Sequence, residues 1–323
     1  MTIKLETEAS RLDDAARAGW LYYVAGNTQD EIARKLGVSR QSAQRLVSLA
    51  VSEKLVKVRL DHPIAHCMEL SHALTTEFGL TMCDVVPSDP DNPGAMIGLA
   101  EAGATEMERH LKSVHPKIIA IGTGRALRAS VQQLAPMDCP QHRIVSLLGN
   151  MMSDGSATAY NVVIRMAERV NARHYPMPLP VFARSPEEKR TLHAQETVHN
   201  IMELAQRADV TFVGVGNMSL TAPMHIDGFI TRDEVRALEK AGAVGEITSW
   251  VFDARGHLID GLINDRVASM PVTPDKTTPF IGIASGQAKV AAIHGALIGR
   301  LINGLITNEA TAEQLLNKSA KAR

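Results

Sequence analysis

The stretch TQDEIARKLGVSRQSAQRL, Thr28 to Leu46, contains two short helical patterns separated by a Gly-Val-Ser turn. Thr28 and Glu31 have the spacing of a capping box, in which each side chain accepts a hydrogen bond from the other residue's backbone N–H. Gly37 permits the left-handed backbone that ends a helix, and Ser39 can cap the helix that follows. The stretch therefore predicts a helix-turn-helix.

The helix that follows this turn, predicted from Arg40 to about Ala50, has an apolar face and a polar face. Its apolar residues recur at helical spacing and face the interior, which leaves arginines and glutamines pointing outward. Arg can pair with guanine and Gln with adenine in the DNA major groove. The predicted DNA contacts on this helix and its cap are Ser39, Arg40, Gln41, Gln44 and Arg45. A small helical packing module with a solvated face is the alternative.

A short wing is predicted directly after the helix-turn-helix. LVKVRL, Leu55 to Leu60, alternates apolar and basic residues, which would place Lys57 and Arg59 near DNA phosphates. Residues 28–60 carry seven basic and three acidic side chains, although the whole chain has a net charge of -1. We therefore predict a winged helix-turn-helix DNA-binding domain in residues 1–60 and an effector-binding and oligomerisation domain in residues 61–323.

The composition of the 323 residues, 45% hydrophobic and 21% charged, is that of a globular protein with one large core and a smaller module. No apolar run approaches the roughly 20 residues that span a bilayer, and the acidic start does not resemble a signal peptide. We expect a cytoplasmic protein with no membrane partner. The three cysteines lack CxxC spacing, and His62 and His66 beside Cys67 fit a linker better than a metal site, so no metal or cofactor is predicted.

The rest of the chain alternates between strand and helix patterns. Strands are predicted at 117–122, 143–149, 210–216 and 279–286, and helices at 125–134, at 157–170, in one long run from Ser185 and from near Gln287. This order indicates an α/β domain with a mainly parallel sheet covered on both faces. Ligands of such domains bind beyond the carboxyl ends of the strands.

Two glycine loops follow predicted strands and open helices. In IGTGRAL, the backbone N–H groups of Thr123, Gly124 and Arg125 could converge on an anion, although a tight strand-to-helix turn explains the glycines equally well. The loop is not a dinucleotide fingerprint, because Leu127 stands where the third glycine belongs. GIASGQAK repeats the arrangement, and Lys289, one turn into its helix, can reach the same mouth. Together they predict a positive pocket in an otherwise acidic body.

The order of these motifs resembles the SorC family of bacterial sugar-responsive transcriptional regulators. The helix-turn-helix is followed by GTGRAL, GAVGEI (242–247), VFDARG (251–256), IGIASGQAKVAAIHGAL (281–297) and GLITNEATAEQLL (304–316). The resemblance covers nearly the whole chain. It implies a winged helix-turn-helix joined to a Rossmann-like effector domain of the sugar-phosphate isomerase type, assembled as a tetramer.

The resemblance also implies an effector site without catalytic residues. Its implied members are Gly122, Thr123, Gly124, Arg125, Asn150, Asn161, Glu246 and Lys289. Members of the family more often have Asp at the position of Glu246 and Thr at that of Ala126. The first difference keeps a carboxylate that accepts from sugar hydroxyls. The second removes a hydroxyl donor and leaves open whether the ligand carries a phosphate.

We predict a regulator of a carbohydrate or polyol catabolic operon that responds to a sugar, a polyol or a sugar phosphate. A single helix-turn-helix covers few base pairs, so the chain should act in pairs on inverted half-sites of operator DNA. One alternative is a sugar-phosphate isomerase-like enzyme with an appended DNA-binding module. That enzyme would need an acid–base pair such as Glu246 with a nearby His, and the sequence contains no compact set of this kind. Another is a constitutive DNA-binding protein with a vestigial body.

Overall fold

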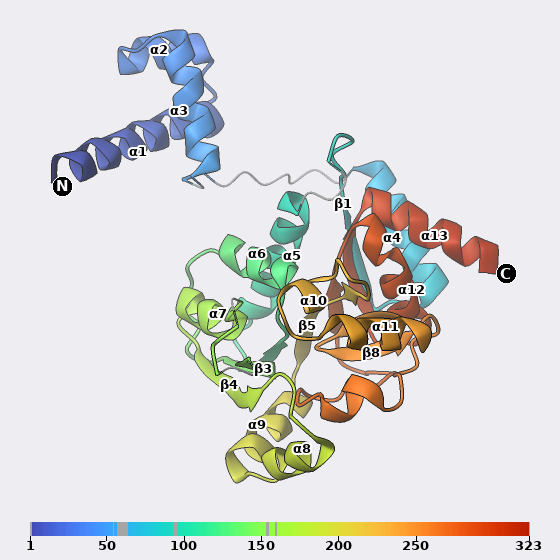
Figure 1. The fold of residues 1–323 in the computed structure, drawn as a ribbon. Coiled ribbons are helices and arrows are strands. Elements are labelled where there is room, and N and C mark those ends of the chain that lie inside the picture. The colour runs from blue at the N-terminus through green and yellow to red at the C-terminus, as the bar shows by residue number, and fades with distance from the viewer. Residues whose placement is uncertain are drawn as a thin grey trace. The chain divides into compact units, whose positions relative to one another are not determined.

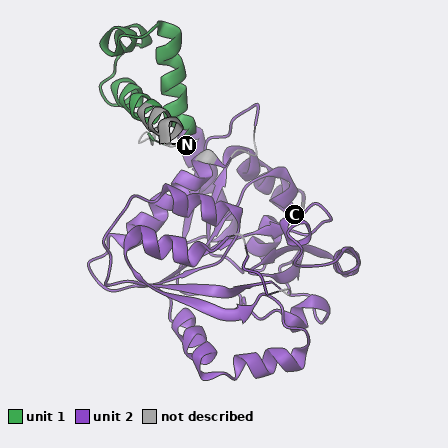
Figure 2. Cartoon of the chain, turned by 60° about the vertical axis from the view of Figure 1, so that its left-hand side comes forward, with its two compact units in different colours: residues 1–63 green, residues 64–323 purple. Residues whose placement is uncertain are grey.

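The computed structural model describes residues 2–53, 55–56, 64–92, 96–152, 155–158 and 160–322. The chain divides into two compact units, Met1–Pro63 and Ile64–Arg323, which Figure 2 shows in different colours. The division falls close to the boundary predicted after residue 60.

The smaller unit is built from α1 (Thr2–Tyr23), α2 (Gln29–Leu36) and α3 (Arg40–Ser52). The predicted capping box is present, since the Thr28 hydroxyl accepts from the Glu31 N–H and the Glu31 carboxylate accepts from the Thr28 N–H at 2.8 Å. Gly37 ends α2 with a φ of 66°, and the Ser39 hydroxyl caps α3. These features confirm the helix-turn-helix. The buried side chains that hold it together are Ala18, Ile32, Ala33, Ala43 and Val47.

The larger unit contains a seven-stranded sheet in which every pair of neighbouring strands is parallel, in the order β1-β10-β9-β5-β2-β3-β4. Its strands are β1 (Met82–Val86), β2 (Ile118–Ile121), β3 (Arg143–Met151), β4 (Arg173–Pro180), β5 (Val210–Gly214), β9 (Phe280–Ile283) and β10 (Gly304–Asn308). The predicted parallel sheet is confirmed.

Helices cover both faces of this sheet (Figure 1). They are α4 (Ala65–Phe78), α5 (Ile97–Leu111), α6 (Arg125–Gln133), α7 (Val162–Val170), α9 (Glu196–Gln206), α12 (Val290–Ile298) and α13 (Glu309–Ala322). The helix α8 (Pro186–His193) lies beside α9 and has no buried residue. Successive residues of β2 point to opposite faces. Ile119 and Ile121 pack in a core with α5, α6 and α7, whereas Ala120 packs in a core with α4, α9, α12 and α13.

A second, antiparallel sheet joins β6 (Gly216–Asn217), β7 (Ala243–Ile247) and β8 (Trp250–Asp253). β6 begins two residues after β5 ends, so the chain passes from one sheet into the other at Val215. Two helices, α10 (Pro223–Ile226) and α11 (Arg232–Lys240), lie between β6 and β7, and the 3₁₀ turns η1 (Leu262–Arg266) and η2 (Gln287–Lys289) follow β8 and β9.

Three predicted elements differ from the structure. The helix predicted from residue 157 begins only at Val162, because the preceding Asn161 has a left-handed φ of 35° that a helix does not allow. The single long helix predicted from Ser185 is two helices, α8 and α9, since Gln195 between them has an extended backbone with ψ 132°. The strand predicted at 210–216 divides between β5 and β6.

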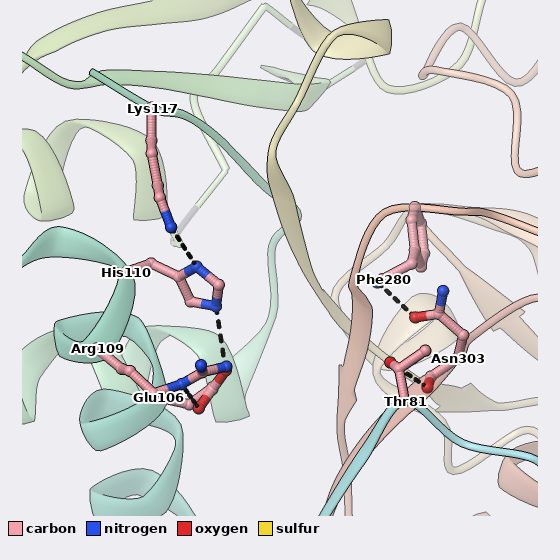
Figure 3. A network of polar contacts seen from close by, with 7 residues as sticks. All are labelled: Thr81, Glu106, Arg109, His110, Lys117, Phe280 and Asn303. Carbon is pink, nitrogen blue, oxygen red and sulfur yellow. Dashed lines mark hydrogen bonds and ion pairs between the residues drawn. The ribbon is translucent and has the colours of Figure 1, made fainter. Parts of the chain in front are cut away.

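Figure 3 shows polar contacts on α5 and at the strand ends, where the Asn303 carbonyl accepts from the Thr81 hydroxyl and its side-chain oxygen accepts from the Phe280 N–H. On α5, the Glu106 carboxylate accepts from the guanidinium of Arg109 and lies 3.1 Å from Nε2 of His110, whose Nδ1 is 3.4 Å from the Lys117 ammonium. Burial alone would raise the pKa of Glu106, but the hydrogen bonds from His110 and Arg109 outweigh it and lower the pKa to about 2. The carboxylate is therefore held ionised inside the fold.

Candidate functional site

A pocket of about 800 Å³, counted with the part open to solvent, lies beyond the carboxyl ends of β2 and β5. Thr123 and Gly124 of the β2–α6 loop, Gly149 of β3 and Gly214 of β5 belong to its wall. The position is the one that a parallel α/β sheet offers a ligand.

Both predicted glycine loops contribute to this pocket with nearly the same backbone. Gly124 precedes α6 with φ 120° and ψ 174°, and Gly286 precedes η2 with φ 113° and ψ 146°. Because Gly124 has no side chain to cap α6, an anion can supply the acceptor that the first-turn N–H groups of that helix require. Lys289 ends η2 and immediately precedes α12, rather than lying one turn inside an α-helix, and it lines the same pocket.

Glu246 lies on strand β7, partly buried, opposite Gly216 of β6. A Cβ at residue 216 would lie 2.1 Å from the Glu246 Oε1, so glycine at this position leaves room for the carboxylate where it now lies. Burial raises the pKa of Glu246, although the Ser249 N–H, which donates to it at 2.8 Å, and the charge of Lys289 oppose the rise. Burial likewise lowers the pKa of Lys289, and Arg125 adds to that effect while Glu246 opposes it. The charges of Glu246 and Lys289 therefore influence each other's pKa across the pocket.

Tyr160 and Asp227 are among the pocket residues that were not predicted from the sequence. The Tyr160 hydroxyl donates to the Asp227 carboxylate at 2.6 Å, and the guanidinium of Arg125 lies 3.6 Å from the same carboxylate. The hydrogen bond with Tyr160 and the charge of Asp227 raise the pKa of Arg125. Since Asp227 and Glu246 balance Arg125 and Lys289, the predicted positive pocket is wrong: its charged lining has two side chains of each sign.

The remaining predicted effector residues lie in a smaller, adjoining pocket. Gly122, Asn150 and Asn161 line a space of about 320 Å³, again counted with the part open to solvent, that shares Thr123 and Gly149 with the larger pocket. The Asn150 side-chain amide donates to the Asn161 side-chain oxygen at 3.3 Å. Asn161 precedes α7 and does not lie within a helix as predicted. The structure thus gathers Thr123, Gly124, Arg125, Glu246 and Lys289 in one pocket and the other three beside it.

The outward face of α3 carries the predicted DNA contacts. Arg40, Gln41, Gln44 and Arg45 are exposed, whereas Ala43, Val47 and Ala50 on the opposite side are buried. Arg40 is 3.5 Å from Asp30 in an ion pair whose two side chains are both exposed, which leaves the guanidinium accessible to a partner. Lys57 and Arg59, with most of the predicted wing strand, lie outside the described residues.

Other site types receive no support from the described part of the chain. It contains no group of three or more His, Cys, Asp or Glu side chains placed to hold a metal ion. His66 instead lies 3.1 Å from Glu313, and His62 is outside the described residues. None of the described helices is long and apolar enough to cross a bilayer.

Comparison with known proteins places the chain in a family. Residues 62–317 match the profile of the family Sugar-bind, a sugar-binding domain. The fold is similar to that of the full-length sorbitol operon regulator SorC from Klebsiella pneumoniae, with a TM-score of 0.68 and 26% identity over 94% of this chain and 99% of that one. The chain belongs to the SorC family of sugar-binding transcriptional regulators.

Curated relatives match this SorC-family chain along nearly their whole length, and they are named as regulators. It is 33% identical over 304 residues to the erythritol catabolism regulatory protein EryD of Brucella abortus (strain 2308), covering 94% of this chain and 96% of that protein. It is 31% identical over 310 residues to the transcriptional regulator LsrR of Escherichia coli (strain K12), covering 94% of each. The protein is therefore a sugar-responsive transcriptional regulator, and the enzyme alternative is not supported.

Proposed function

We propose that the pocket beyond β2 and β5 binds the effector through Thr123, Gly124, Arg125, Glu246 and Lys289. The observation that carries this proposal is their convergence, because three segments far apart in the sequence meet at one pocket. Backbone donors, a carboxylate and an ammonium group then surround a single small volume. Gly122, Asn150 and Asn161 of the adjoining pocket would contact the part of the effector that extends past Thr123 and Gly149.

The charge balance of the lining favours a polyhydroxylated effector. Carboxylates accept hydrogen bonds from sugar or polyol hydroxyls, and the Lys289 ammonium and Arg125 guanidinium donate to them. If the effector carries a phosphate, the uncapped N-terminus of the nine-residue helix α6 is the place that suits it. EryD is named for the catabolism of erythritol and the Klebsiella regulator for the sorbitol operon, so polyols and their phosphate esters are the first compounds to test.

DNA reading is assigned to the exposed face of α3. Arg40, Gln41, Gln44 and Arg45 would contact base edges, Ser39 would position the helix start, and Lys57 and Arg59 would contact phosphates. Pairs of subunits would bind inverted half-sites, within a tetramer. Any effector that binds one arrangement of subunits more tightly shifts the population toward it, and operator DNA changes effector affinity by the same factor.

A thermal-shift screen of the full chain tests the effector assignment. The panel is erythritol, sorbitol, common pentoses and hexoses, and their phosphate esters. A ligand present at 100 times its Kd should add about 2.7 kcal/mol to the free energy of unfolding. At least one member should raise the melting temperature in a saturable way, and a chain that responds to none would overturn the proposal. Light scattering that finds a stable monomer would contradict the tetramer.

A further inference from the structure

The hairpin turn between β7 and β8 has an unusual backbone. Its two residues, Thr248 and Ser249, both lie in the left-handed region, with φ of 48° and 74°. Two-residue turns of this kind usually contain Asn-Gly, and a positive φ at a β-branched residue such as threonine is a genuine outlier. Strain of this sort persists only where the surrounding structure enforces it, and it gathers at binding sites.

Hydrogen bonds from neighbouring segments hold the strained turn in place. The hydroxyl of the fully buried Ser269 donates to the Thr248 carbonyl at 2.6 Å, and the Ser249 N–H donates to the Glu246 carboxylate at 2.8 Å. The Trp250 indole N–H donates to the Met270 carbonyl at 2.9 Å. The turn, and with it the Thr248 side chain, therefore has a fixed position at the pocket wall.

The hydroxyl of Thr248 is buried without a partner. The residue is 8% exposed, and among the described residues nothing forms a hydrogen bond with its Oγ1. Buried hydroxyl groups in folded proteins nearly always have a partner, so this one calls for an explanation. Thr248 lines the larger pocket together with Glu246 and Lys289. A ligand oxygen in that pocket is the partner that the fold itself does not supply.

We propose that the Thr248 hydroxyl is a specificity-determining contact that pairs with a hydroxyl or anionic oxygen of the effector. This inference rests on the proposed effector site and adds a residue that no motif identified. Thr248 lies on the pocket wall, and the same turn holds the Glu246 carboxylate through the Ser249 N–H. A site built in this way discriminates against an analogue that lacks the matching oxygen, because the buried hydroxyl would again have no partner.

The substitution Thr248→Val tests the contact, because valine has the same shape and the same β-branching. It should weaken binding of the most stabilising panel compound about ten-fold or more, as expected for the loss of one hydrogen bond. The effector-free melting temperature should stay the same or rise, since a buried hydroxyl without a partner is removed. Thr248→Ser keeps the hydroxyl and should retain most of the affinity.

Thr307 provides a matched control on β10. Its Oγ1 is also buried without a partner among the described residues, but Thr307 does not line either effector pocket. Thr307→Val should leave effector affinity unchanged and should likewise not lower the melting temperature. Calorimetric titration gives the effector affinity of the three variants and the parent, and thermal denaturation gives their effector-free melting temperatures.

The outcomes separate this inference from the proposed function. If the parent responds to a panel compound and Thr248→Val binds it equally well, the Thr248 contact is wrong and the effector site stands. If Thr248→Val instead lowers the effector-free melting temperature while affinity is unchanged, the hydroxyl has a structural role and the contact is again wrong. If the parent responds to no compound, the proposed function fails and this inference fails with it.

Discussion

Two carboxylates of the larger unit, the buried Glu106 and the partly buried Glu246, differ in how many hydrogen bonds their neighbours donate to them. Glu106 accepts hydrogen bonds from Arg109 and His110, and its pKa falls to about 2 despite burial. Glu246 accepts from the Ser249 N–H, and burial raises its pKa. The first carboxylate is saturated by its own chain, whereas the second keeps bonding capacity at a pocket wall. We interpret the pairing of Glu106 as stabilising the fold, and the remaining bonding capacity of Glu246, at a pocket wall, as available to a ligand.

The largest expected effect is on stability, from Glu106→Gln. Because the pKa of Glu106 falls from 4.5 to about 2 on folding, the ionised carboxylate contributes about 3 kcal/mol to the free energy of unfolding at pH 7. This contribution is fully present above pH 4.5 and is lost as the pH falls toward 2. Urea unfolding at pH 7 should show the substituted chain less stable by up to that amount.

The same unfolding series has an internal check. The difference in stability between the parent and Glu106→Gln should shrink when both are measured at pH 3. Glu239, an exposed residue of α11, provides the control, and Glu239→Gln should leave stability unchanged at both pH values. A difference that stays constant between pH 7 and pH 3 would show that the Glu106 charge is not what stabilises the fold.

The next largest effect is expected on effector affinity, from a substitution in the effector pocket. Lys289→Ala removes a charge-assisted hydrogen bond of about 1.5–3 kcal/mol, so effector affinity should fall roughly ten-fold or more. Operator affinity without effector should not change, because Lys289 belongs to the other compact unit from α3. Gln287→Ala is the matched control, since Gln287 lies in the same turn and does not line the effector pocket. Parental affinity in Lys289→Ala would remove the second glycine loop from the site.

A smaller effect is expected at the exposed face of α3, on operator binding rather than on effector binding. Arg40→Ala or Gln44→Ala should weaken operator binding by about 1–3 kcal/mol without loss of stability. Lys57→Ala should instead weaken binding to all DNA sequences alike and flatten the salt dependence, because phosphate contacts carry no sequence information. Gel-shift titrations against operator and unrelated DNA separate the two classes. If Arg40→Ala binds operator as tightly as the parent, α3 does not read operator DNA as proposed.

The smaller unit could be predicted closely from the sequence because its signals are local. Thr28 and Glu31 are three residues apart, and Gly37 with Ser39 defines the turn wherever the motif lies. The glycine loops of the effector pocket are local in the same sense, which is why Thr123, Gly124 and Lys289 could be found. The motif order then implied Glu246.

The rest of the pocket could not be predicted because its contacts join distant residues. Tyr160 and Asp227 are 67 positions apart and belong to no motif, so the balance of charge was missed. Thr248 and Ser249 lie two and three residues after Glu246, but their types become informative only once the hairpin and its left-handed turn are known. The long helix predicted from Ser185 failed similarly, since the break at Gln195 has no glycine or proline to mark it.

Thermal denaturation of Glu246→Gln and Glu106→Gln, each with and without the most stabilising panel compound, tests the central distinction most directly. Burial penalises the ionised form of Glu246, so the neutral Glu246→Gln chain should melt at or above the parent temperature. It should lose most of the effector-dependent shift, because the carboxylate that accepts from the effector is gone. Glu106→Gln should melt lower and keep its shift. A Glu246→Gln chain that keeps the full effector shift, or that is destabilised as strongly as Glu106→Gln, would contradict the account.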